Sequence, residues 1–217
     1  MSEPPQTDMS AVERLALKFG ELVNERDPGK WLQNQFLRQV TYPWVRFVLA
    51  NRMLIDGLED LRALRPEAGV MVVSNHRTFF DQFALMLACY IGDVPWFRDI
   101  QFPVRSNFFY EQPLGVLMNA AISGATMYPP VFRQAERRKL NDDALDKMAA
   151  YLQRPGALLG MHPEGTRGKG DDPYQLLPAQ PGVGKVALVA RPMVVPLFLL
   201  GLTNDFVADV RLNFTGR

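Results

Sequence analysis

From Gly69 onward, the sequence alternates short apolar runs with longer stretches whose apolar residues recur at helical spacing. The first run, residues 70–73, is followed by a helical stretch at residues 79–91. This alternation is typical of α/β domains. It predicts an α/β fold with a central, mostly parallel mixed sheet flanked by helices. Further strands are expected at residues 94–97, 125–128, 157–161, 194–200 and 207–212, and further helices at residues 134–152 and 183–190.

The segment before this alternation has a different pattern. Residues 1–9 read as a loose tail, and Ser10 with Glu13 forms a capping-box pattern that predicts the start of an amphipathic helix. A second apolar stretch, residues 31–54, is expected to be helical and interrupted near Pro43. We therefore divide the chain into a tail with amphipathic helices at residues 1–54 and a single folded domain at residues 55–217. The two helices either pack on the domain or anchor it at a lipid interface.

Composition narrows the classes of protein to consider. The 217 residues carry a formal net charge of only +1, which gives no electrostatic reason to expect a nucleic-acid partner. The single cysteine, Cys89, cannot form an internal disulfide, so the chain needs no oxidising compartment. The polar N-terminus does not resemble a signal peptide, and no apolar run reaches the roughly 18 residues that a membrane span requires. These features favour a protein of the cytoplasm.

A histidine and an aspartate follow the first predicted strand. His76 comes where that strand ends, and Asp81 falls near the start of the next helix, from which it can bond one imidazole nitrogen of His76. Such an aspartate fixes the tautomer and leaves the other nitrogen as a base. The sequence has no G-x-S-x-G nucleophile elbow. A base without a protein nucleophile indicates direct attack by a substrate hydroxyl or by water.

A second polar motif, residues 162–167, follows the strand expected at residues 157–161 and reads His-Pro-Glu-Gly-Thr-Arg. Gly165 permits a tight turn that presents backbone amides to an anion, and Arg167 offers a fork suited to phosphate. Taken alone, the motif is better interpreted as an ordinary Pro-Glu-Gly turn with a solvated arginine.

Together, and in this order, the two motifs resemble the glycerolipid acyltransferase family, which includes lysophosphatidate acyltransferase. The resemblance runs from about residue 54 to residue 202 and includes the segment 194–197. It implies that residues 55–217 form an acyltransferase domain, in which His76 is the general base and Asp81 orients it. It also implies that the phosphate of the acceptor is held by Glu164, Gly165, Thr166 and Arg167.

The substrates are likewise implied by the resemblance. The donor would be a thioester of coenzyme A or acyl carrier protein, and the acceptor a lysophospholipid, 1-acylglycerol-3-phosphate, in phospholipid biosynthesis. A thioester has a good leaving group, so a positioned base and proximity suffice, and no metal or other cofactor is expected. The enzyme would work peripherally on the cytoplasmic face of a membrane.

Several positions depart from the family pattern. The middle motif, residues 123–133, matches loosely, and Arg133 is the candidate for a phosphate-binding arginine there. Arg98 or Arg105 stands where relatives often carry lysine, and both also fit a solvated surface role. His162 replaces a residue that is commonly aromatic, and a structural role is expected for it. The glycine-containing segment 181–185 is not a nucleotide-binding loop, because Ala179 and Val186 break that pattern.

Two other functions fit part of this pattern. A thioester or lipid hydrolase would use His76 to activate water instead of an acceptor hydroxyl. A non-catalytic lipid-binding protein of the same fold would not need the pair His76 and Asp81, whose presence argues against it.

Overall fold

A computed structural model describes residues 9–132, 134, 137–170, 172, 174–203 and 205–215. The chain divides into two compact units, which are described separately. Unit 1 comprises Met1–Thr41 and Gln101–Ala150, and unit 2 comprises Tyr42–Ile100 and Tyr151–Arg217. Arg133 lies outside the described residues, so the structure does not place this candidate.

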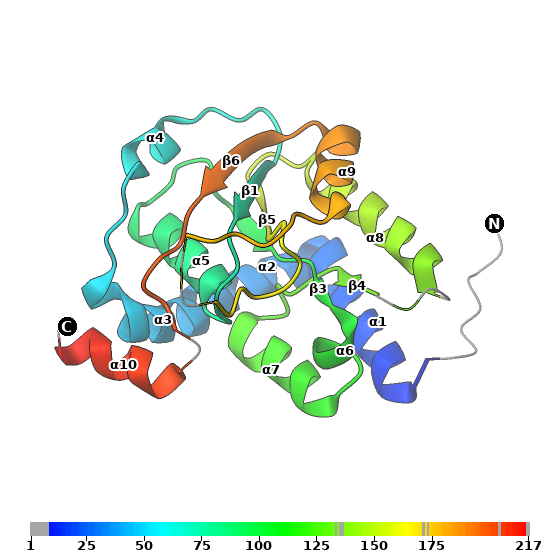
Figure 1. Cartoon of the computed structure of the whole chain (residues 1–217). Coiled ribbons are helices and arrows are strands. Elements are labelled where there is room, and N and C mark those ends of the chain that lie inside the picture. The colour runs from blue at the N-terminus through cyan, green and yellow to red at the C-terminus, as the bar shows by residue number, and fades with distance from the viewer. Residues whose placement is uncertain are drawn as a thin grey trace. The chain divides into compact units, whose positions relative to one another are not determined.

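Unit 1 consists mainly of helices (Figure 1). Its helices are α1 (Ala11–Glu25), α2 (Asp27–Phe36), the π-helical turn η2 (Leu37–Thr41), α6 (Ser106–Phe109), α7 (Pro113–Ser123) and α8 (Arg138–Tyr151). Its two short strands, β3 (Val104–Arg105) and β4 (Pro130–Val131), pair in parallel. The helix start predicted at Ser10 is confirmed, because the Ser10 hydroxyl accepts the Glu13 backbone N–H at 3.1 Å.

Unit 2 holds the main sheet. Its strands are β1 (Val70–Ser74), β2 (Asp99–Gln101), β5 (Ala157–Met161) and β6 (Met193–Leu197), in the order β2-β5-β1-β6. Its helices are α3 (Tyr42–Leu49), η3 (Ala50–Arg52), α4 (Leu58–Ala63), α5 (Asp81–Ile91), α9 (Pro181–Ala190) and α10 (Phe206–Thr215). The central strand β1 pairs in parallel with both β5 and β6. The predicted α/β fold, with a parallel sheet flanked by helices and preceded by N-terminal helices, is confirmed.

The strand order of the main sheet has a switch point. The connection from β1 through α5 to β2 crosses the sheet in one direction, and the connection from β5 through α9 to β6 crosses it in the other. Helices α5 and α9 lie on opposite sides of β1 in Figure 1. Neighbouring strands whose connections leave to opposite faces form a switch point, where ligands bind beyond the carboxyl ends. Here those strands are β1 and β5.

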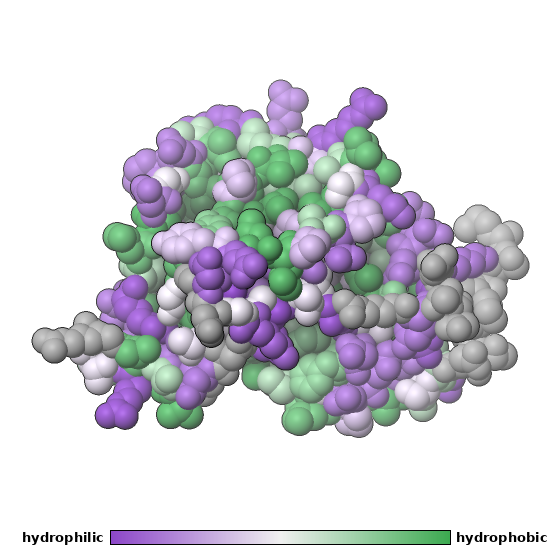
Figure 2. Space-filling view, viewed as in Figure 1, coloured by the Kyte–Doolittle hydropathy of each residue, from purple (hydrophilic) through white to green (hydrophobic). Residues whose placement is uncertain are grey.

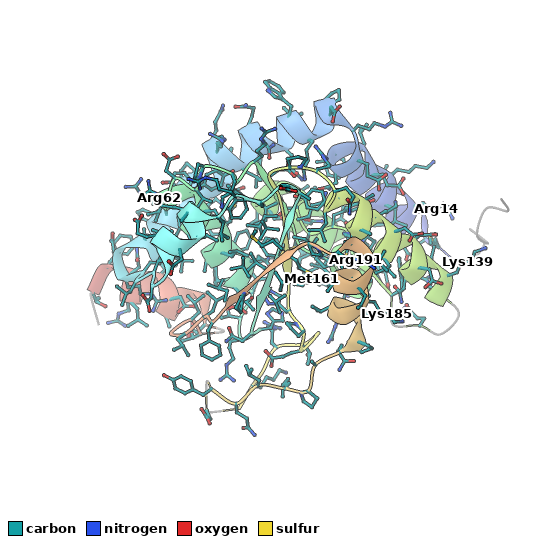
Figure 3. The ribbon with its side chains drawn as sticks, turned by 90° about the horizontal axis from the view of Figure 1, so that it is seen from above. Arg14, Arg62, Lys139, Met161, Lys185 and Arg191 are labelled. Atoms are coloured by element: carbon teal, nitrogen blue, oxygen red, sulfur yellow. The ribbon has the colours of Figure 1, made fainter. Side chains whose placement is uncertain are left out.

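Burial explains the central strands. Val70, Met71 and Val72 of β1 are at most 1% exposed, and Ala157, Leu158 and Leu159 of β5 are fully buried. Met161, the last residue of β5, is surrounded by side chains in Figure 3 and only 8% exposed. A continuous apolar run suits a strand that is covered on both faces, so these strands were recognisable from composition.

Three strand predictions were wrong. Residues 94–97 form a turn, and the strand that follows, β2, begins only at Asp99. Residues 125–128 are irregular, because Ala125 adopts a left-handed backbone with φ 60°, and the paired residues are those of β4 instead. Residues 207–212 lie in helix α10, whose start is capped by Asp205: its carboxylate accepts the Ala208 N–H at 3.0 Å.

Candidate active site

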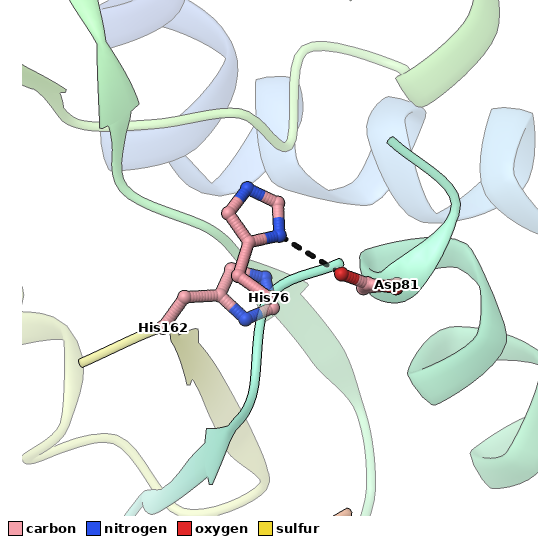
Figure 4. Close-up of side chains that lie close together, drawn as sticks. All are labelled: His76, Asp81 and His162. Carbon is pink, nitrogen blue, oxygen red and sulfur yellow. Dashed lines mark hydrogen bonds and ion pairs between the residues drawn. The ribbon is translucent and has the colours of Figure 1, made fainter. Parts of the chain in front are cut away.

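His76 lies just beyond the carboxyl end of β1, and Asp81 is the first residue of α5 (Figure 4). His76 Nδ1 lies 2.9 Å from Asp81 Oδ2, as the sequence predicted. The same oxygen accepts the backbone N–H groups of Arg77 at 2.7 Å and Thr78 at 3.0 Å. Three donors thus converge on one oxygen of this carboxylate at the start of α5. Asp81 is therefore held in place by residues 76–78, and its carboxylate in turn holds that loop together.

This geometry fixes the tautomer of His76. An ionised carboxylate only accepts, so Nδ1 carries the ring proton and donates it to Asp81. The second nitrogen, Nε2, then has an available lone pair, and the side chain is 20% exposed. The arrangement is that of a general base with its orienting carboxylate.

The backbone of His76 is bonded on both sides to the turn that follows β5. Its N–H donates to Glu164 Oε1 at 2.8 Å, and its C=O accepts the Gly168 N–H at 2.7 Å. Glu164 is 5% exposed, and its other oxygen accepts the Leu177 N–H at 2.9 Å. Both oxygens of Glu164 thus accept main-chain N–H groups, and the turn holds the main chain of His76 directly.

Beyond Glu164, the middle of the turn leads to two exposed residues. Gly165 has a left-handed φ of 59°, which a glycine adopts without strain, and its N–H closes the turn onto the His162 carbonyl at 3.0 Å. Thr166 and Arg167 are exposed. The turn therefore brings Glu164, Gly165, Thr166 and Arg167 beside the loop of His76, with only Glu164 directed inward. The candidate arginines Arg98 and Arg105 belong to different units, and Arg98 is exposed.

Asn75 holds the same loop from the other side. Its Nδ2 donates to the Leu199 carbonyl at 2.8 Å, and its Oδ1 accepts the Leu199 N–H at 2.7 Å. The side-chain amide therefore bonds the Leu199 main chain as the backbone of a paired strand would. In this way it continues the pairing of β1 with β6. Sequence reasoning gave Asn75 no such role, although its place directly before the histidine of the motif was a signal.

His162 packs against His76, which the sequence did not predict. The two rings stack with centroids 4.1 Å apart and planes 9° from parallel (Figure 4). His162 Nδ1 lies 3.1 Å from the Asn75 carbonyl, 3.3 Å from the Ser74 carbonyl and 3.0 Å from Ser74 Oγ. Since carbonyls only accept, Nδ1 carries the proton, and it cannot take one from Ser74. Ser74, 5% exposed, is thus not activated as a nucleophile.

Burial and the neighbouring His76 lower the pKa of His162 from 6.5 to about 4, against the opposing charge of Asp81. His162 is therefore neutral at the pH of a cell. Ring nitrogens of both histidines and a carboxylate oxygen of Asp81 lie within 4.8 Å of one another. However, a ring nitrogen binds a metal in the plane of its ring, and two stacked, nearly parallel rings do not direct their lone pairs to one point. This arrangement suits acid–base chemistry better than a shared ion.

Comparison with known proteins agrees with this geometry. A family model described as acyltransferase matches residues 52–199, which is more than half of the chain and includes every residue of this site. The chain belongs to the acyltransferase family. No curated protein and no solved structure matches it.

The acyltransferase match ends at Leu199, the residue that pairs with Asn75. The matched residues therefore include every residue described above that hydrogen-bonds to the loop of His76. Within the part of this acyltransferase that the structure describes, no helix is both long and apolar enough to cross a membrane.

Proposed function

We propose that the protein transfers a fatty acyl group from a thioester of coenzyme A or acyl carrier protein to the free hydroxyl of a lysophospholipid. The proposed acceptor is 1-acylglycerol-3-phosphate, in phospholipid biosynthesis. The observation that carries the proposal is the bond between His76 Nδ1 and Asp81 Oδ2, which leaves Nε2 as a base. Ser74 faces a protonated nitrogen of His162, so this neighbouring hydroxyl is not activated as a nucleophile.

In the proposed reaction, His76 Nε2 takes the proton of the acceptor hydroxyl while its oxygen attacks the thioester carbonyl. The C–O bond forms, the C–S bond breaks, and the proton passes from His76 to the leaving sulfur. Asp81 stabilises the imidazolium that exists between these steps. A base placed in this way contributes about 10²- to 10⁴-fold to the rate.

The phosphate of the acceptor is proposed to bind at the turn after β5. Thr166 and Arg167 are exposed there, and the left-handed Gly165 shapes the backbone around them. Arg133 is retained as a further candidate. We propose that Glu164 contributes by holding the turn, because both of its oxygens accept backbone N–H groups and a carboxylate repels phosphate.

Association with a membrane surface, on its cytoplasmic face, is proposed from helix α1. Its apolar residues Leu15, Phe19 and Leu22 are 70%, 41% and 49% exposed, whereas Glu13 and Asn24 are 2% exposed. The helix therefore turns its apolar face outward, which suits a lipid interface. Apolar surface is also visible over α7 in Figure 2, where Leu114 and Leu117 are 62% and 63% exposed.

The decisive experiment measures thioester consumption with and without lysophosphatidic acid, for the wild type and for His76→Ala. We expect consumption to require the acceptor and to fall by at least about 100-fold in the variant. Consumption without acceptor, with release of free fatty acid, would indicate a hydrolase. Consumption that does not depend on His76 would refute the proposed base.

A separate measurement tests the phosphate site. Arg167→Ala should raise the KM for the acceptor much more than the KM for the thioester. An equal effect on both constants would argue against a phosphate contact at Arg167.

A further inference from the structure

The ring of His76 is fixed at one edge by a single hydrogen bond to Asp81. That hydrogen bond at Nδ1 favours one orientation of the ring, but on its own it opposes rotation of the ring about the Cβ–Cγ bond only as strongly as a single hydrogen bond can. A base must aim its Nε2 lone pair, which lies in the ring plane, at the acceptor hydroxyl. A second contact on the face of the ring would restrict this rotation further.

His162 supplies that contact. Its ring covers one face of the His76 ring at 4.1 Å with an interplanar angle of 9°. Stacked aromatic pairs at this separation attract each other beyond the area that they bury. The ring of His162 is itself held at Nδ1 by the carbonyls of Ser74 and Asn75, which belong to the loop that carries His76.

We propose that His162 is a positioning residue, whose neutral ring holds the plane of the His76 imidazole so that Nε2 points at the acceptor. This inference rests on the proposed function, because it assigns His162 a part in base catalysis. It goes beyond that function by naming a residue other than the proposed base and its orienting carboxylate.

The stack, rather than the hydrogen bonds of His162, carries this role. The loop of His76 is already tied to the neighbouring strands by Glu164, Gly168 and the side chain of Asn75. Loss of the Nδ1 contacts alone would leave those ties in place. No other aromatic ring among the described residues stacks on His76, so loss of the His162 ring would uncover its face.

The proposed role also requires the ring of His162 to be uncharged. Apart from main-chain groups, His162 has His76 and Asp81 as its charged or titratable neighbours. A proton on His162 would place a cation against the imidazolium that forms on His76 during transfer. Burial and the adjacent His76 lower the pKa of His162 to about 4, which prevents this at neutral pH.

The test compares His162→Phe, which keeps a ring, with His162→Leu, which fills similar space without one. Two properties of the full chain are measured: kcat with the acceptor, and the downfield proton NMR signal of the His76–Asp81 hydrogen bond. Asp81→Asn identifies the signal. We expect the phenylalanine variant to keep a sharp signal and a kcat close to that of the wild type. The leucine variant should broaden or lose the signal and lower kcat by about 100-fold, with little change in KM.

Circular dichroism of each variant verifies that it is folded, and His162→Met replaces the leucine variant if that one is not. A leucine variant with the wild-type signal and kcat would overturn the proposal. A phenylalanine variant as impaired as leucine would also overturn it, because the hydrogen bonds would then carry the role. The signal is recorded without substrate, so it remains informative even if the acyl-transfer assay refutes the proposed function.

Discussion

Glu164 holds the loop of the proposed base through two hydrogen bonds to main-chain groups. Its two oxygens accept the N–H groups of His76 and Leu177, and the side chain is 5% exposed. In Glu164→Gln, one of those N–H groups would face an amide NH₂ instead of an oxygen. A buried donor without an acceptor costs about 1–3 kcal/mol.

We therefore expect Glu164→Gln to lower kcat by about 10- to 100-fold, with a smaller change in the KM for the acceptor. Steady-state kinetics measures both constants. Lys169→Ala, at an exposed position after the same turn, should leave both constants largely unchanged and serves as the control. If the KM rises while kcat is preserved, Glu164 binds the acceptor directly, as the family resemblance implied.

The depressed pKa of His162 also predicts how stability depends on pH. Its ordinary pKa of 6.5 applies in the unfolded chain and falls to about 4 on folding. Between these values the unfolded chain binds a proton that the folded chain does not, so lowering the pH favours unfolding. The stability lost from His162 between pH 6.5 and 4 is at most about 3 kcal/mol.

Urea unfolding across this pH range measures the effect. His162→Phe has no titrating group at this position, so its free energy of unfolding should fall less steeply toward acid pH than that of the wild type. Equal slopes for the two proteins would show that His162 does not titrate in this range.

At the scale of elements, the sequence was most informative where local chemistry decides the structure. Strand β5 was predicted with its observed limits, because a continuous apolar run buried on both faces has no competing interpretation at that length. The start of α1 followed from the Ser10 cap. Helix α10 was mistaken for a strand because its buried face is polar: Asp209 is 0% exposed and bonds Arg52 at 2.6 Å, while Val207 is 72% exposed.

In the candidate site, too, the local contact could be predicted from the sequence and the long-range contacts could not. The bond between His76 and Asp81 spans five residues and starts at a strand end, so it was predictable from spacing. The contacts of Glu164 and His162 with the His76 loop join residues 87 and 88 positions apart. They depend on β1 and β5 being neighbours, which the sequence does not specify. The structure supplied this pairing, and with it the stacked histidines.

The Ser10 cap offers a test of a single element. Ser10→Ala should lower the free energy of unfolding by about 1 kcal/mol, because the Glu13 N–H loses its acceptor. Chemical denaturation measures the change. Lys18→Ala, on an exposed position of α1, should stay within about 0.5 kcal/mol of the wild type. A Ser10 variant as stable as this control would mean that the cap does not limit the stability of α1.

At the scale of the whole molecule, the outward apolar face of α1 predicts binding to lipid. Replacing Leu15, Phe19 and Leu22 together by serine should weaken binding to anionic phospholipid vesicles by at least about tenfold. Vesicle co-sedimentation measures this, and transfer to a short-chain soluble acceptor should be unaffected. Serine at Leu188 and Val189, which are 77% and 57% exposed on α9, removes comparable apolar surface as a control. Equal losses of vesicle binding in both variants would indicate nonspecific hydrophobic adsorption rather than a binding face on α1.

The peptide of His76 is bonded to the turn after β5 through both its N–H and its C=O. The base and the turn therefore move as one body. An acceptor whose headgroup is too large for the turn would displace it, and the base would be carried out of line with the hydroxyl. Such a molecule would still occupy the site but react slowly. Acceptors with different headgroups would then differ in the rate at which the bound complex reacts rather than in their affinity. Poor acceptors would therefore act as inhibitors.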